Sequence, residues 1–430
     1  MGDKLICSID IGSSKISTLV AILDEKKEDV RIIGYDKVDS SGVKKGLIVD
    51  IDKAAEKLEE SVIKAERMSG RKINRAYVTV GGPHIASLNS HGVVAVSDPE
   101  GEITEEDVFR VIEAAKAISL SGTREMIEIL PREYIVNGQS GITNPVGMSG
   151  VRLEVETHII TASSTSLKNI ERVLSQVGIE NQGFVYSALA SSQAILTETE
   201  KELGVLVVDI GGGKTDICMF VEGAVSYSSS LPIGAKNITN DIAVGLRISL
   251  SSAEKIKLYL SKKYEETSFF SSKTSGGRGF KDEILDSAKI GIPERLEGIK
   301  IRRVMNEIII PRYEEIFSLI GEEIQKSGFS DRIPSGIVLT GGGSLSPAIE
   351  EVGRKVLGMP IRIGYPKGVS GLIEEVSTPE FASAIGLILY VKENIMKEGF
   401  EVKNFDRILR SLSFASYLRK LREFIKQYIP

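Results

Sequence analysis

The sequence predicts an α/β protein with a duplicated core, and three glycine-rich loops lead to that prediction. In residues 206–217, LVVDIGGGKTDI, an apolar β-branched run breaks at an aspartate into three glycines and resumes as a second strand. Residues 7–22, CSIDIGSSKISTLVAI, repeat the same order of strand, aspartate, small-residue loop and lysine. A third glycine run, VLTGGGSLSP at residues 338–347, follows another apolar strand.

Loops of this kind are suited to binding phosphate. Glycine lets the backbone approach a ligand closely, and successive N–H groups can point at phosphate oxygens. An aspartate before each of the first two loops, Asp10 and Asp209, is placed to hold a hydrated Mg²⁺ beside that phosphate. The two hairpins are therefore predicted to form one clamp around the tail of a nucleotide. The ending GGGKT imitates a P-loop, but that motif requires glycine at position 208, which is Val208.

Length and composition restrict the function further. A chain of 430 residues can hold two or more cores, and its net charge of −5 argues against nucleic-acid binding. Cys7 and Cys218 fall in predicted buried strands, and the three histidines lack metal-ligand spacing. We find no signal-peptide pattern and no apolar run long enough to span a bilayer, so we expect a cytoplasmic protein body.

The order of predicted elements divides the chain into core segments, an insertion and a C-terminal extension. The insertion is expected to contain strands at 85–96, 127–136 and 151–160 and a helix at 105–120 capped by Thr104 and Asp107. The predicted segments are a first-half core (1–83), an inserted α+β interaction subdomain (84–160), first-half core continued (161–200), second-half core (201–235), a second-half outer subdomain (236–330), core with a closing helix (331–391), a linker (392–404) and an amphipathic helix (405–430).

Three smaller features are expected within these segments. Small residues at 186–196 and 379–390 predict two helices that pack closely beneath the cleft. Residues 264–281 are rich in serine and glycine and predict a mobile loop. Residues 299–327 predict a long helix that is interrupted at Pro311.

The C-terminal residues predict an amphipathic helix that binds a membrane surface. Apolar residues recur at helical spacing and basic residues occupy the other side, which is typical of helices that lie on anionic membranes. A helix that docks on the protein's own body or on a partner is the alternative. The residues expected to make the membrane contact are Phe414, Leu418, Lys420, Leu421, Arg422, Phe424, Ile425 and Lys426.

The three loops resemble the phosphate-1, phosphate-2 and adenosine motifs of the superfamily of actin, the heat-shock chaperones and the sugar kinases. The insertion, the C-terminal helix and the ordered motifs DIGSSK, DIGGGKTD, GAKNITNDIA and LTGGG resemble the FtsA family of bacterial cell-division actins over nearly the whole chain. This resemblance implies an actin-like fold, ATP and Mg²⁺ as cofactors, and head-to-tail self-polymerisation. It also implies peripheral attachment to the cytoplasmic side of the cell membrane at the division site. The implied partners are the C-terminal peptide of the tubulin homologue FtsZ, expected on residues 236–330, and downstream division proteins.

The resemblance also implies a set of binding residues. Lys15 would contact the phosphates, whereas Lys214 stands where the superfamily usually has threonine. Glu254 and Lys257 would contact ribose and adenine, and an ordinary exposed helix pair is an equally weighted alternative. The implied nucleotide-binding residues are Asp10, Gly12, Ser13, Ser14, Lys15, Asp209, Gly211, Gly212, Gly213, Lys214, Gly234, Asn237, Glu254, Lys257, Gly341, Gly342 and Gly343, with Asp10 and Asp209 also at the metal.

One position departs from the superfamily pattern. Tyr186 aligns near the Glu or Gln that positions the attacking water in related proteins, and Gln193 lies two helical turns further along. We therefore expect at most a slow ATPase. Another actin-like scaffold, of the pilus-assembly type, remains an alternative, as does a small-molecule kinase, for which we find no catalytic aspartate. A heat-shock chaperone would need a substrate-binding domain after the core, where this chain has a linker and one helix.

Overall fold

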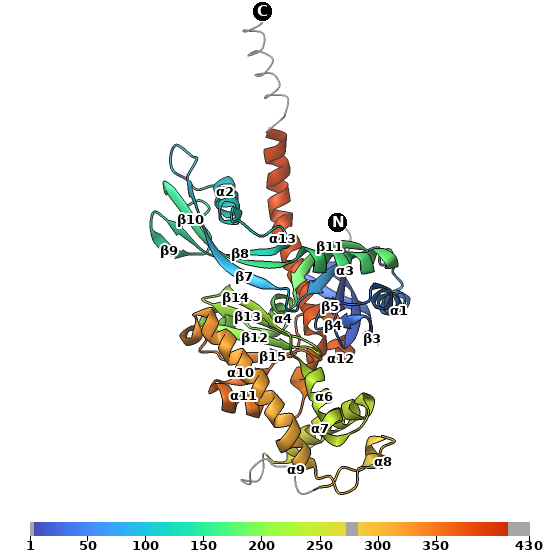
Figure 1. Ribbon diagram of the computed structural model, residues 1–430. Coiled ribbons are helices and arrows are strands. Elements are labelled where there is room, and N and C mark those ends of the chain that lie inside the picture. The colour runs from blue at the N-terminus through green and yellow to red at the C-terminus, as the bar shows by residue number, and fades with distance from the viewer. Residues whose placement is uncertain (1–3, 272–282, 412–430) are drawn as a thin grey trace, which may run out of the picture.

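The computed structural model describes residues 4–271 and 283–411, with side chains described to Tyr264 and from Glu283 to Met396 (Figure 1). It contains two core sheets, an inserted subdomain with its own sheet, and helices around them. The predicted α/β fold with a duplicated, actin-like core and an inserted α+β subdomain is confirmed. The residues predicted to bind a membrane, 414–426, lie outside the described part of the chain.

The two core sheets share one strand order. In the first sheet the strands run β11-β6-β1-β2-β3, with the short β17 beyond β3. In the second sheet, given from the corresponding edge, they run β16-β15-β12-β13-β14. In each sheet the first strand pairs antiparallel with the second and parallel with the fourth in the repeat. The strands are β1 (Lys4–Ile11), β2 (Lys15–Asp24), β3 (Asp29–Asp39), β6 (Arg75–Val80), β11 (Glu180–Tyr186), β12 (Val205–Ile210), β13 (Thr215–Val221), β14 (Ala224–Leu231), β15 (Ile337–Thr340), β16 (Ile361–Ile363) and β17 (Ser370–Gly371).

The two hairpin turns also have the same hydrogen bond. The N–H of Gly12 donates to the carbonyl of Lys15 at 2.9 Å, and the N–H of Gly211 donates to that of Lys214 at 2.9 Å. The repeat recognised in the sequence is thus a repeat of backbone geometry, because strand order and turn closure both recur.

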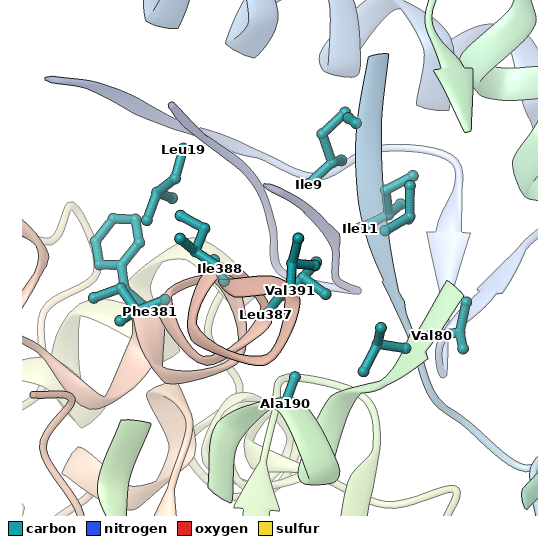
Figure 2. Packing of buried hydrophobic residues seen from close by; sticks show 14 of the residues in the cluster. Ile9, Ile11, Leu19, Val80, Ala190, Phe381, Leu387, Ile388 and Val391 are labelled. Atoms are coloured by element: carbon teal, nitrogen blue, oxygen red, sulfur yellow. The ribbon is translucent and has the colours of Figure 1, made fainter. Parts of the chain in front are cut away.

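Two helices pack closely between the halves, as the small residues predicted. In α4 (Ser187–Ile195) and α13 (Ala382–Ser411), a Cβ on Gly386 would stand 1.8 Å from the carbonyl oxygen of Ala190, so only glycine permits this crossing. Figure 2 shows Leu387 and Ile388 of α13 between Ala190 and the side chains of β1 and β2. The other first-half elements are β4 (Val43–Lys44), β5 (Leu47–Ile48), α1 (Ile51–Ser69) and α3 (Ser164–Val177).

The inserted subdomain has a small core of its own. Its sheet runs β7-β10-β8-β9 and is covered by α2, and Val111, Ala115 and Leu153 are buried between them. Thr104 and Asp107 form the predicted capping box, although the helix ends at Lys116, before the expected residue 120. The elements are β7 (Ala86–Ala95), α2 (Glu105–Lys116), β8 (Arg124–Val136), β9 (Gln139–Ile142) and β10 (Arg152–Ser163).

The second half carries an outer helical subdomain. Residues 264–271, expected in a mobile loop, continue α7 as far as Ser271, and the rest of the predicted loop to 281 lies outside the described residues. A turn of π-helix ends at Ile309, just before Pro311, which lies in the first turn of α10 and so marks the predicted interruption. The elements are α5 (Glu198–Leu203), α6 (Ala235–Leu246), α7 (Leu250–Ser271), α8 (Ser287–Ile290), α9 (Ile301–Val304), η1 (Met305–Ile309), α10 (Ile310–Ser327), η2 (Ser330–Arg332), η3 (Gly342–Leu345), α11 (Ile349–Leu357), α12 (Ile373–Val376) and η4 (Pro379–Phe381).

A linker was expected at 392–404, but these residues are helical, because α13 continues through them to Ser411. The segment contains one glycine and no proline, so nothing in its backbone chemistry stops a helix that has begun. The end of α13 extends away from the body beside the inserted subdomain (Figure 1). Among the described helices, none has the length and apolar character needed to cross a bilayer.

Candidate functional site

A cavity of about 590 Å³ lies where the two hairpin loops and the third glycine loop meet. Most of the residues predicted from the sequence border it. Those that line the cavity are Asp10, Gly12, Ser13, Ser14, Lys15, Asp209, Gly211, Gly212, Lys214, Glu254, Lys257, Gly341, Gly342 and Gly343.

The two aspartates lie near the ends of equivalent strands, β1 and β12, and each is held by a neighbouring hydroxyl. Thr79 donates to Asp10 at 2.5 Å, and Ser191 donates to Asp209 at 2.7 Å. Burial raises the pKa of Asp209 to about 6. Two oxygen ligands with room for water are what Mg²⁺ prefers, so these residues fit a hydrated magnesium ion.

Glycines bring the three loops into contact. A Cβ on Gly212 would lie 1.7 Å from the hydroxyl oxygen of Ser14, so the first and second loops can meet only with glycine here. Gly341 has φ of 79° and lies against the carboxylate of Asp209, where a Cβ would stand 2.3 Å from an oxygen. The third loop is therefore fixed against the second by backbone that a side chain would displace.

The two lysines of the repeated motif have different surroundings. Lys15 donates to the main-chain carbonyl of Glu380 and lies 4.3 Å from the centre of the Phe381 ring. Lys214 is ion-paired with Asp216 and lies 3.0 Å from the hydroxyl of Ser187.

Electrostatics at Lys214 favour the charged form. Burial would lower the pKa of Lys214, but Asp216, Asp209 and Asp10 outweigh burial and raise it. Lys214 is thus a charged group at the second loop whose partner in this structure is Asp216.

Glu254 and Lys257 face the cavity together. Their charged groups are 2.8 Å apart, and both contact the hydroxyl of Thr239 on α6. The Lys257 side chain is 8% exposed, so this pair differs from an ordinary surface pair of a helix.

Three of the predicted residues lie behind the cavity lining. Asn237 accepts a hydrogen bond from the N–H of Gly234 at 3.1 Å and closes the first turn of α6. The first N–H groups of this helix, from Ala235 and Lys236, donate to the carbonyls of the second loop at 2.9 and 2.8 Å. Gly213 packs against Ser13 of the opposite loop.

Tyr186 is fully buried and has a structural role. Its hydroxyl accepts from the N–H of Ile217 at 2.9 Å and contacts the carbonyls of Ile217 and Ser229. Burial raises its pKa well above the ordinary range, so it stays protonated. Gln193 accepts a hydrogen bond from Lys201 and is not among the residues that line the cavity.

Several residues at the site were missed by the sequence reasoning. Thr79 could have been found, because it lies one residue before the end of β6, the strand next to β1, and pairs with Asp10. Lys236 donates to the carbonyl of Ser13 at 2.6 Å, across the two loops. Lys37 and Glu380 belong to no motif and reach the cavity only through tertiary packing.

The repeated sheets and the shared cavity define an actin-like protein. The likeness to a solved structure agrees with this fold: the "PilM-PilN type IV pilus biogenesis complex" covers 90% of this chain and 98% of its own, with a TM-score of 0.58 and 16% identity. This likeness concerns the fold alone.

Sequence comparison identifies the family. The family model "Cell division protein FtsA" matches residues 206–386, and "SHS2 domain inserted in FTSA" matches residues 82–161. The Cell division protein FtsA of Pseudomonas aeruginosa is 37% identical over 90% of this chain and 89% of its own, and that of Borreliella burgdorferi is 38% identical over 96% and 98%. The chain belongs to the FtsA family and is an actin-like cell-division protein.

Proposed function

We propose that this chain binds Mg²⁺–ATP between its two hairpins, polymerises, and tethers the FtsZ ring to the cytoplasmic face of the membrane. The observation that carries the proposal is a single cavity bordered by both aspartates and by all three glycine loops. A duplicated clamp of this kind provides backbone donors on both sides of a polyphosphate.

The charges around the cavity favour a nucleotide that arrives with a divalent cation. The described lining has five carboxylates, Asp10, Asp39, Asp209, Glu254 and Glu380, and four lysines, Lys15, Lys37, Lys214 and Lys257. Because these charges nearly balance, a triphosphate would add uncompensated negative charge. Magnesium would supply the missing positive charge, and Asp10 and Asp209 would hold it beside the phosphates.

Hydrolysis is expected to be slow. Tyr186 stays protonated and its hydroxyl is already bonded to two strands, so it has no free acceptor to orient an attacking water. The nucleotide would then act mainly as a ligand that holds the two halves of the core together.

The remaining parts of the proposal concern partners. The basic amphipathic helix predicted at residues 405–430 would attach the chain to the membrane. The outer subdomain of the second half, residues 236–330, would bind the C-terminal peptide of FtsZ, and the inserted subdomain would take part in assembly and in recruiting downstream division proteins.

Calorimetry with Mg²⁺–ATP tests the nucleotide site. Asp10→Ala and Asp209→Ala should each weaken binding, because each removes part of the metal's surroundings. Asp331→Ala, at an exposed aspartate in η2 away from the cavity, is the matched control and should bind normally. Unchanged affinity in both cavity variants would refute this assignment of the loops.

A further inference from the structure

Three charged side chains that no shared motif brings together meet on one wall of the cavity. The ammonium group of Lys37 is ion-paired with the carboxylate of Glu380, and that of Lys15 lies 3.8 Å from the other oxygen of the same carboxylate. Both ammonium groups also lie near the ring of Phe381, at 4.3 and 5.5 Å from its centre. One carboxylate is therefore shared by two lysines at the cavity surface.

These residues lie where the first and third glycine loops approach each other. Lys15 begins β2, Lys37 lies near the end of β3, and Glu380 lies in η4, whose first residue accepts a hydrogen bond from the N–H of Gly341 at 3.1 Å. All three charged residues line the cavity. The carboxylate thus stands beside backbone groups that suit phosphate.

A carboxylate at this position resembles a phosphate in its preferences. Both anions accept hydrogen bonds from ammonium groups, and the attraction between either anion and an ammonium group is stronger where solvent exposure is low. Burial alone would raise the pKa of Glu380, but Lys15 and Lys37 hold it below its ordinary range, so the group is ionised near neutral pH. Since Lys15 and Lys37 already have an anionic partner, a polyphosphate must share or displace Glu380 to reach them.

We propose that Glu380 competes with the nucleotide's phosphates for Lys15, and that Lys37 is a further phosphate-binding cation. The inference rests on the proposed nucleotide function and adds to it two residues that set phosphate affinity. The side chain of Lys37 is 48% exposed and on the strand next to Lys15, so it can turn from the carboxylate to a phosphate without movement of the backbone.

The proposal predicts opposite effects for the two residues. Glu380→Gln keeps the size of the side chain but removes its charge, so Mg²⁺–ATP and Mg²⁺–ADP should bind about fivefold more tightly, as expected for loss of one partly exposed ion pair. Lys37→Gln should weaken the binding of both Mg²⁺–ATP and Mg²⁺–ADP. Adenosine, which has no phosphate, should bind all variants equally.

Calorimetry on the full-length protein with Mg²⁺–ATP, Mg²⁺–ADP and adenosine tests the inference, with thermal melting of the free protein as a check on folding. Glu374→Gln, at an exposed glutamate of α12 outside the cavity lining, is the matched control and should bind as the wild type does. Unchanged or weaker ATP binding by folded Glu380→Gln would overturn the competition.

A second variant keeps the test decisive should Glu380→Gln fail to fold. Unchanged ATP and ADP binding by Lys37→Gln would overturn the role of Lys37, and an equal loss of adenosine binding would show a general disturbance of the cavity and overturn it too. Failure of the wild-type protein to bind any of the three ligands would instead refute the proposed nucleotide function.

Discussion

Tyr186 has a structural role at a position where the family resemblance predicted a water-positioning residue to be replaced. Its ring is buried at the start of α4, and its hydroxyl joins β13 to β14 by bonds to Ile217 and Ser229. The hydroxyl of Tyr186 therefore holds two strands together.

Tyr186→Phe should therefore lower stability without changing ATP turnover. The substitution leaves the buried N–H of Ile217 without its acceptor, which should cost about 1–3 kcal/mol. Chemical denaturation measures the loss, and a steady-state ATPase assay measures turnover. A large fall in turnover in the folded variant would show that the hydroxyl takes part in hydrolysis.

Glu128 gives a prediction for pH. This residue of β8 accepts a hydrogen bond from Tyr390 of α13 at 2.6 Å, and burial raises its pKa from 4.5 to about 8. The folded protein therefore keeps a proton that the unfolded chain releases, so the contribution of this group to stability falls as pH rises from about 4.5 to about 8.

Glu128→Gln removes this titration, so its melting temperature should rise relative to wild type across the same pH range. Glu125→Gln, at an exposed position of the same strand, is the control and should follow the wild type. A constant difference between Glu128→Gln and wild type from pH 5 to pH 8 would contradict the assignment.

Residues that recur in the sequence were the ones that could be predicted. Asp10 and Asp209 were found because the same hairpin occurs twice, and both reach the cavity. The ion pair of Lys214 with Asp216 could also have been proposed from the sequence, because the two residues are only two positions apart, at the turn that leads into β13. Glu380 could not be found, because its contacts join residues more than 300 positions apart and depend on how η4 packs.

At the scale of elements, the inserted subdomain meets the second half through polar contacts. Ser87 donates to the carbonyl of Ser228 on β14 at 2.7 Å, and Arg132 donates to Ser226 at 3.1 Å. His158 lies within 3.0 Å of the Ser228 hydroxyl, and burial lowers its pKa to about 3, so it is neutral at physiological pH. The groups of β14 that contact the insertion are therefore polar, and water could replace these contacts if the insertion were removed.

Deletion of residues 84–160 should leave a soluble, folded core that binds the FtsZ peptide as tightly as the full chain, while assembly is impaired. The ends of the insertion lie together, because Ala86 pairs with Thr161, so a short junction can replace it. Fluorescence anisotropy measures peptide binding, and circular dichroism checks folding. Lost peptide binding in a folded deletion protein would place the partner site on the insertion.

Elements with a strong period or a cap were predicted well, and element ends were not. The helix α2 was found from its capping box, yet it ends at Lys116. The prediction of a linker at 392–404 was wrong. Its polar composition indicates solvent exposure, and a helix that extends from the body is exposed to solvent in the same way. Polarity alone does not distinguish an exposed helix from a loop.

At the scale of the molecule, the cavity joins parts that are distant in the sequence. The first glycine loop belongs to the first half and the second and third loops belong to the second half, and α13 packs beside α4 beneath them. A nucleotide bound there would contact both halves and favour the arrangement in which they are closed. The outer helix α7 and the end of α13 lie at opposite ends of the molecule (Figure 1), so the proposed FtsZ site and the helix that leads to the proposed membrane anchor would be far apart.

The most direct test of the tethering proposal is co-sedimentation of a labelled FtsZ C-terminal peptide with anionic vesicles in the presence of this protein and Mg²⁺–ATP. The peptide should pellet only when the protein is present. Leu421→Glu should abolish pelleting, because it places a charge on the apolar face of the predicted helix. Ser416→Glu, which puts the same charge on the opposite face, should reduce it only slightly. Full pelleting of the peptide with the Leu421→Glu protein would contradict the account.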